Sequence, residues 1–131
     1  MESAPRHQAR ERALTLLYEA ELKDATPTAI LGELSVAPDD YTTTLVEAVE
    51  ARRPEIDTMI DETAIGWDLD RMAVVDRNVL RLAVAELLSS ADVPTAVVLN
   101  EAVELASAYS TDDSGRFVNG VLATLATRIR P

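Results

Sequence analysis

The segment MAVVDRNVLRLAVAELLSS, residues 72–90, decides the fold because it is the most apolar stretch of this 131-residue chain. Its residues Val79, Leu80, Ala83 and Leu87 recur at the spacing that places side chains on one face of an α-helix. A helix as apolar as this one is normally covered by its neighbours on most sides. We therefore expect it at the centre of the molecule.

Six further segments around this central helix are also predicted to be helical. The chain has only four glycines and six prolines, and its long segments are rich in alanine, leucine, glutamate and arginine, which favour helices. No repeat or flexible linker separates independent domains, so we predict one all-α domain of about seven helices over residues 1–131. The six other helices are expected at about residues 5–23, 27–34, 39–53, 54–66, 92–109 and 113–130.

The composition argues against an enzyme and against a secreted or membrane protein. Cysteine is absent, His7 is the single histidine, and the four glycines are isolated, so thiolate chemistry, a serine triad and a phosphate loop all lack parts. No apolar run approaches the roughly 20 residues of a membrane span, and the N-terminus is charged where a signal peptide is apolar. We expect a soluble, cytoplasmic, non-catalytic protein without a cofactor.

Two pairs of carboxylates raise the question of a metal site. Asp39 with Asp40 and Asp112 with Asp113 could offer oxygen ligands to a hard cation. Both pairs fall where helices are expected to begin, and short acidic side chains are selected there by the free N–H groups and the helix dipole. Helix capping is the favoured interpretation, and no metal site is predicted.

The charges of the chain are distributed unevenly along its length. The formal net charge is −11, yet residues 1–12 carry +1 and residues 116–131 carry +3, which leaves −15 for the 103 residues between them. Nucleic-acid affinity comes mainly from basic residues that neutralise phosphate. The pattern indicates an acidic body that suits a basic partner, beside a small arginine-bearing edge that suits RNA.

Several side chains lie on helix faces that do not suit a simple core. Tyr18, with Leu14 beside it, falls opposite the apolar face of its helix and suggests a docking surface, unless a neighbouring helix covers it. Phe117 lies about 100° from the core face of the last helix, with Asp113 and Arg116 on the same flank. It could stack on a base, anchor a partner or pack at the edge of the core. Asp76 lies in line with the core face of the central helix, where it needs a partner or an exposed first turn.

Three blocks of sequence resemble the NusB family of bacterial transcription antitermination factors, and together they span the whole chain in order. The most specific block is the last one, in which NEAVELA, residues 100–106, is followed by FVNGVL, residues 117–122. The first two blocks are carried by Arg6, Ala9, Arg10, Ala13, Leu17 and Tyr18, and by Asp76, Arg77, Leu80, Arg81, Ala83, Glu86 and Leu87.

The resemblance implies two small packed helical bundles, about residues 1–66 and 67–131, and a non-enzymatic role. NusB-like proteins bind the boxA element of ribosomal RNA leaders together with the ribosomal protein NusE, within the RNA polymerase antitermination complex. By this resemblance RNA is contacted by Arg6, Arg10, Arg116 and Phe117, and the partner by Tyr18, Asp76 and Asp113. His7 and Gln8 depart from the family, which is often basic at these positions.

Three alternatives remain open at this stage. The chain could be a protein-interaction adaptor whose RNA surface is degenerate. It could be the RNA-targeting helical domain of an RNA cytosine methyltransferase whose catalytic domain is another polypeptide. It could also form a homodimer through the Tyr18 surface, which would compete with partner docking.

Overall fold

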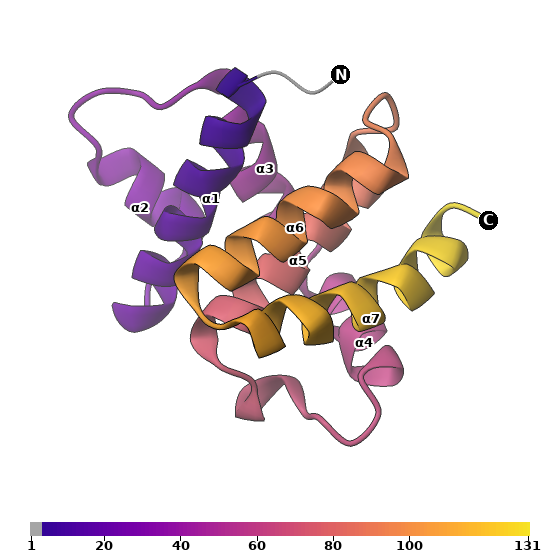
Figure 1. Ribbon diagram of the computed structural model, residues 1–131. Coiled ribbons are helices and arrows are strands. Elements are labelled where there is room, and N and C mark those ends of the chain that lie inside the picture. The colour runs from indigo at the N-terminus through magenta and orange to yellow at the C-terminus, as the bar shows by residue number, and fades with distance from the viewer. Residues whose placement is uncertain (1–3) are drawn as a thin grey trace.

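The computed structural model describes residues 4–131, and over these residues the chain forms seven α-helices, one 3-10 turn and no strand (Figure 1). The all-α prediction and the number of helices are confirmed. The 3-10 turn was not predicted. The elements are α1 (Ala4–Leu22), α2 (Pro27–Glu33), α3 (Asp40–Ala51), α4 (Arg53–Thr63), η1 (Leu69–Arg71), α5 (Val74–Ser89), α6 (Thr95–Tyr109) and α7 (Asp112–Ile129).

Helix α5 occupies the centre of the molecule, as its apolar sequence predicts. It packs against α1, α3, α4, α6 and α7, and Figure 1 shows it in the middle of the other helices. Every residue from 78 to 87 is buried, including the charged side chains Arg81 and Glu86. Arg81 donates hydrogen bonds to Asp57 of α4 at 2.9 Å and to Glu21 of α1 at 3.1 Å. The central helix is therefore bound to its neighbours by ion pairs as well as by apolar packing.

Side chains at the predicted starts cap three of the helices. Ala29 donates its backbone N–H to Thr26 at 3.2 Å, Tyr41 to Asp39 at 2.8 Å, and Ser114 to Thr111 at 3.0 Å. These bonds satisfy N–H groups that have no partner within their own helix. The capping interpretation of Asp39 is confirmed. At α7 the cap is Thr111, and the two aspartates that follow it form the first turn.

The structure decides two local questions. Leu14 is only 2% exposed, because α1 packs against α5 as well as against α2 and α3, so neighbouring helices cover it while Tyr18 stays exposed. The fourth helix ends at Thr63, and Gly66 belongs to the loop after it, where a φ of +85° suits glycine.

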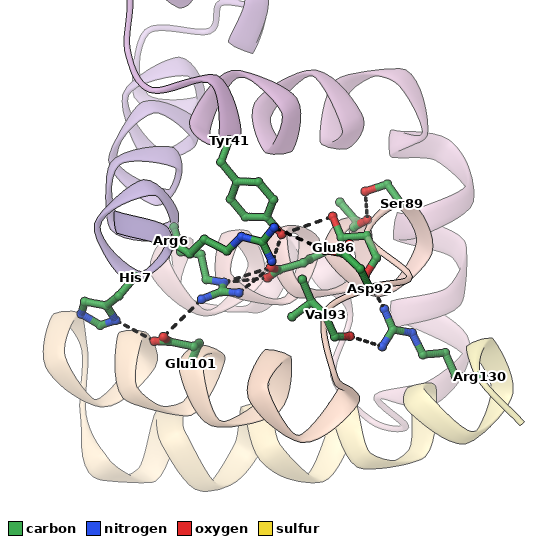
Figure 2. Close-up of polar contacts among 12 residues, drawn as sticks. Arg6, His7, Tyr41, Glu86, Ser89, Asp92, Val93, Glu101 and Arg130 are labelled. Atoms are coloured by element: carbon green, nitrogen blue, oxygen red, sulfur yellow. Dashed lines mark hydrogen bonds and ion pairs between the residues drawn. The ribbon is translucent and has the colours of Figure 1, made fainter. Parts of the chain in front are cut away.

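The end of α7 is fixed to the end of α5 by a single arginine. Arg130 donates hydrogen bonds to the backbone oxygens of Leu87 at 3.1 Å, Ser90 at 2.9 Å and Val93 at 2.6 Å, part of the network drawn in Figure 2. Leu87 lies in the last turn of α5, Ser90 caps that helix, and Val93 lies in the loop that follows. The charge of Arg130 is therefore used inside the fold and is not displayed to a ligand.

Replacing Arg130 with methionine should lower the free energy of unfolding by about 1.5–3 kcal/mol, because the charged hydrogen bonds that join α7 to the end of α5 and the loop after it are lost. Urea denaturation followed by circular dichroism measures this loss. Arg128→Met is the matched control on the same helix, since Arg128 and its partner Glu62 are both half-exposed and such pairs contribute about 1 kcal/mol or less. Equal losses of stability in the two variants would contradict the conclusion that Arg130 fixes the end of α7 to the end of α5.

Candidate functional site

A pocket of about 210 Å³ lies where α7 begins beside α5 and the loop before it. Two aromatic rings form one side of it: Trp67 and Phe117 meet edge to face, with their centroids 5.9 Å apart and their planes at 64°. Trp67 is 55% exposed and Phe117 half-buried, so both rings can be reached from outside. The pocket is lined by Trp67, Met72, Ala73, Asp76, Thr111, Asp113, Ser114 and Phe117.

Asp76 places a carboxylate in the lining of this pocket. Its Oδ2 accepts a hydrogen bond from Ser114 at 3.1 Å. Its Oδ1 is buried and accepts none from the residues that the structure describes. A buried carboxylate oxygen without a donor is unfavourable in the isolated chain, so a ligand that carries an N–H group can improve its environment.

The structure brings together three side chains that the sequence singled out separately. Asp76, Asp113 and Phe117 line the same pocket, and Arg116 stands next to it in an exposed ion pair with Asp113. Sequence reasoning missed Trp67, because it lies in a loop where no helical period marks the face of a side chain. Its one available signal is that it is the single tryptophan of the chain.

Tyr18 borders a second depression of about 340 Å³, which shares no lining residue with the first pocket. Leu14, Thr15, Val75 and Tyr109 line it with Tyr18, and Tyr18 itself remains exposed. Leu22, one turn further along α1, is also largely exposed. An apolar groove beside exposed aromatic residues has the character of a protein-docking surface, and its role in partner binding remains a prediction.

Arg6 lies at the surface near the start of α1. Its Nη2 donates a hydrogen bond to Asp92 at 3.3 Å, and its guanidinium carbon lies 4.7 Å from the centre of the Tyr41 ring. A cation over an aromatic face is held electrostatically. Figure 2 shows Arg6 beside Tyr41, with Asp92 in the same view. The place of Arg6 suits contact with a phosphate, and this role remains a prediction.

Arg10 differs from the sequence-based expectation because its side chain lies inside the protein. It is 2% exposed, and its guanidinium donates to Glu86 of α5 at 2.7 Å and to Glu101 of α6 at 3.2 Å. The RNA contact expected of Arg10 requires a side chain at the surface, and the fold places it between helices. The sequence cannot show this burial, because Arg10 and Glu86 are 76 residues apart.

The carboxylate of Glu86 binds a second side chain besides Arg10. Tyr41 of α3 donates its hydroxyl to Glu86 at 2.5 Å. Burial of the Tyr41 hydroxyl, together with this hydrogen bond, raises the pKa of Tyr41 to about 12. Tyr41 therefore keeps its proton at physiological pH and remains a donor to Glu86. The arrangement connects α1, α3 and α5 at one point.

His7, Glu101 and Glu104 form the one group, among the described residues, whose ligand atoms lie close enough to hold a metal ion. His7 Nδ1 lies 2.7 Å from Glu101 Oε2. This hydrogen bond raises the pKa of His7, and the nearby charges of Glu101, Glu11 and Glu104 act in the same direction against partial burial. A raised pKa favours the proton over a metal ion at Nδ1, since a metal needs the neutral imidazole.

The His7 imidazole should titrate above its usual pKa of about 6.5 in the folded protein. The linked contribution to stability is complete below the unfolded pKa and is lost as the pH rises through the folded pKa. Because His7 is the single histidine, proton NMR measures its titration without ambiguity. Glu101→Gln should return the pKa toward its usual value, and the control Glu104→Gln should change it less. Equal changes of the His7 pKa in both variants would contradict the conclusion that the hydrogen bond to Glu101 is its main cause.

The three arginines that the sequence places at the C-terminal end all have partners within the protein. Arg116 pairs with Asp113 and Arg128 with Glu62, while Arg130 binds backbone carbonyls. The first pair is strongly exposed, with 74% of the Arg116 side chain accessible. Arg116 is more exposed than Arg128, the other ion-paired arginine of this end, and can exchange its partner for a phosphate at little cost.

No helix over residues 4–131 combines the length and the apolar character needed to cross a membrane.

Comparison with known proteins shows that most of the chain is similar to one protein family. A model of the NusB family matches residues 7–127. The transcription antitermination protein NusB of Acidothermus cellulolyticus is 52% identical over 124 residues, covering 92% of this chain and 86% of the relative. The NusB protein of Saccharopolyspora erythraea is also 52% identical, over 127 residues with the same coverage.

Solved structures of NusB proteins have the same fold as this chain. T. maritima NusB superposes with a TM-score of 0.88 at 34% identity, over 99% of this chain and 96% of that one. A crystal structure of the antitermination factors NusB and NusE in complex with dsRNA contains a chain with a TM-score of 0.82 at 30% identity, over 97% of this chain and 99% of that one.

Proposed function

The chain belongs to the NusB family of transcription antitermination proteins, and we propose that it acts by binding a boxA-type single-stranded RNA jointly with a NusE-like ribosomal protein. The observation that carries the proposal is the pocket beside Phe117, which joins two accessible aromatic rings and a carboxylate oxygen that has no donor among the described residues, with the exposed Arg116 next to it. The similarity to a NusB chain solved with NusE and dsRNA supports the joint binding of RNA and a NusE-like partner.

Phe117 and Trp67 supply the base-binding part of this surface. Aromatic rings bind unpaired bases by stacking, which contributes about 1–3 kcal/mol per base. The unpaired Oδ1 of Asp76 can accept a hydrogen bond from an amino or imino group of a base, because it has no competing donor among the described residues. Stacking on an aromatic side chain needs an unpaired base that can leave its own stack, so a pocket of this kind suits a single strand.

Arg116 and Arg6 supply the phosphate-binding part. Arg116 is held by Asp113 in a strongly exposed pair, so a phosphate can replace that carboxylate with little loss. Arg6 presents its guanidinium at the start of α1 beside the Tyr41 ring. With so few phosphate contacts, binding by the chain alone is weak and a basic partner adds the missing charge.

The partner surface combines the Tyr18 groove with the acidic residues beside it. Tyr18 supplies exposed apolar area, while Asp76 and Asp113 lie at the neighbouring pocket, where RNA and partner would meet. The net charge of −11 favours association with a basic ribosomal protein through complementary fields. We assign the protein a non-catalytic role in the cytoplasm, within the RNA polymerase antitermination complex, as one domain of two helical subdomains, residues 1–66 and 67–131.

Arg116→Gln tests the phosphate contact. Fluorescence anisotropy with labelled boxA-type RNA and the NusE-like protein should show weaker binding, and the salt dependence should lose about 0.7 from its log–log slope, the single-strand value for one contact. Arg52→Gln is the matched control, because Arg52 also forms an exposed pair with a carboxylate three residues away. The same loss in both variants would show that only net charge matters.

A homodimer through the Tyr18 groove is the second candidate, favoured by the exposed apolar side chains gathered there. It would bury the surface assigned to the partner and so compete with it. Light scattering of the purified chain distinguishes the two. A monomeric mass at high concentration argues against the dimer, and a dimeric mass that the NusE-like protein fails to reduce argues against partner docking at this groove.

A further inference from the structure

Arg10 lies at the centre of a buried polar network that connects the N-terminal and C-terminal helices. Its Nε and Nη2 donate to the two carboxylate oxygens of Glu86 at 2.7–3.0 Å. Its Nη1 donates to Glu101 at 3.2 Å. A guanidinium presents several donors in a rigid fork, which a lysine ammonium does not. Arg10 therefore fixes two carboxylates at once, one on α5 and one on α6.

Two paths lead from Arg10 to cationic groups at the surface. Along the first, Glu86 accepts the hydroxyl of Tyr41, and the ring of Tyr41 lies under the guanidinium of Arg6. Along the second, the other oxygen of Glu101 contacts His7 Nδ1 at 2.7 Å. Figure 2 shows the two ends of the network, with Tyr41 and Glu86 on one side and His7 and Glu101 on the other.

We propose that Arg10 is a positioning residue for RNA binding, which orients Arg6 through Glu86 and Tyr41 and orients His7 through Glu101, and that Arg6 and His7 make the phosphate contacts. This inference rests on the proposed function, because RNA is the ligand it concerns. It assigns His7 to the RNA surface, where the chain departs from the basic residues frequent in the family.

The burial of Arg10 argues against a direct contact with RNA. To reach a phosphate, its guanidinium would have to leave Glu86, which is 1% exposed. A buried carboxylate that loses its cationic partner is strongly destabilised. Arg6 and His7 have no such restriction, since each side chain is partly exposed at the start of α1. Three carboxylates face His7, namely Glu101 and Glu104 from α6 and Glu11 from α1, and all of them favour its charged form.

Arg10→Lys separates positioning from direct contact, because lysine keeps the charge but cannot hold both carboxylates. Its first measurement needs no RNA: proton NMR of the single histidine. The pKa of His7 should fall toward its usual value, since Glu101 is no longer held against the imidazole. Arg12→Lys on the exposed face of the same helix is the control and should leave it unchanged. A His7 pKa in Arg10→Lys equal to that of the unsubstituted protein would overturn the inference while leaving the proposed function intact.

The second measurement is RNA affinity with the NusE-like protein present. Arg10→Lys should weaken binding by about fivefold, the scale of one exposed ionic contact. It should have no effect once Arg6→Gln and His7→Gln are already present, because coupled residues are not additive. Equal losses in both backgrounds would show that Arg10 touches RNA itself. Unchanged affinity in the original background would show that it positions nothing. Both results overturn the inference.

A second variant protects the test against a failure to fold. Arg10→Met combined with Glu86→Leu removes both buried charges, and such replacements are often tolerated when the volume is kept. It leaves Arg6, His7 and Glu101 in place. The same fivefold loss of affinity is expected, and its absence would overturn the inference.

Discussion

Replacing Arg10 with methionine should lower the free energy of unfolding by about 3–5 kcal/mol, because the carboxylate of Glu86 stays buried without its cation. Glu86 is 1% exposed and accepts hydrogen bonds from Arg10 at 2.7–3.0 Å. The hydroxyl of Tyr41 is the donor left to it among the described residues. Urea denaturation of the purified chain measures the loss.

The control for this prediction removes the other charge as well. Arg10→Met with Glu86→Leu should recover most of the lost stability, since a buried ion pair can be replaced by apolar side chains at little cost. The recovery separates a lost ion pair from lost packing. If the double variant is as unstable as the single one, the buried charge is not the cause.

Replacing Phe117 with alanine should weaken RNA binding by about 5- to 150-fold, which corresponds to the 1–3 kcal/mol of one stacked base. Phe117 meets Trp67 at the edge of the pocket and is half-buried. Anisotropy titrations with labelled boxA-type RNA and the NusE-like protein measure the change.

Val36→Ala is the matched control for Phe117→Ala. Val36 is an exposed apolar side chain in the loop between α2 and α3, so its truncation should leave RNA binding unchanged. Thermal denaturation of both variants shows whether they remain folded at the temperature of the titration. A folded Phe117→Ala variant with normal RNA affinity would contradict the proposal that an RNA base stacks on Phe117.

The helices were predictable because their apolar residues recur at helical spacing and because three of them begin at a capping side chain. Helix α5 shows this most clearly, since its apolar sequence alone places it at the centre. The pocket was predictable in part, because Asp76 and Phe117 stand on faces that do not suit a simple core. Their meeting depends on how α5 and α7 pack, and the period of one helix carries no information about its neighbours.

The errors have the same physical origin. The period of α1 gives one core face, but the helix is covered from more than one side, which buries Arg10. Burial of Arg10 depends on carboxylates 76 and 91 residues away in sequence. The charge pattern misled in a similar way at the C-terminal end, where Arg128 and Arg130 are paired or used inside the fold.

One titration tests the central claim of joint RNA and partner binding most directly. Labelled boxA-type RNA and a scrambled RNA of the same length are each titrated with the purified chain, with and without the NusE-like protein, at two salt concentrations. We predict that the partner strengthens boxA binding well above scrambled RNA, and that the chain alone binds weakly with a log–log salt slope of about −2 to −3. Equal binding of the two RNAs, or full boxA affinity without the partner and without salt dependence, would contradict the claim.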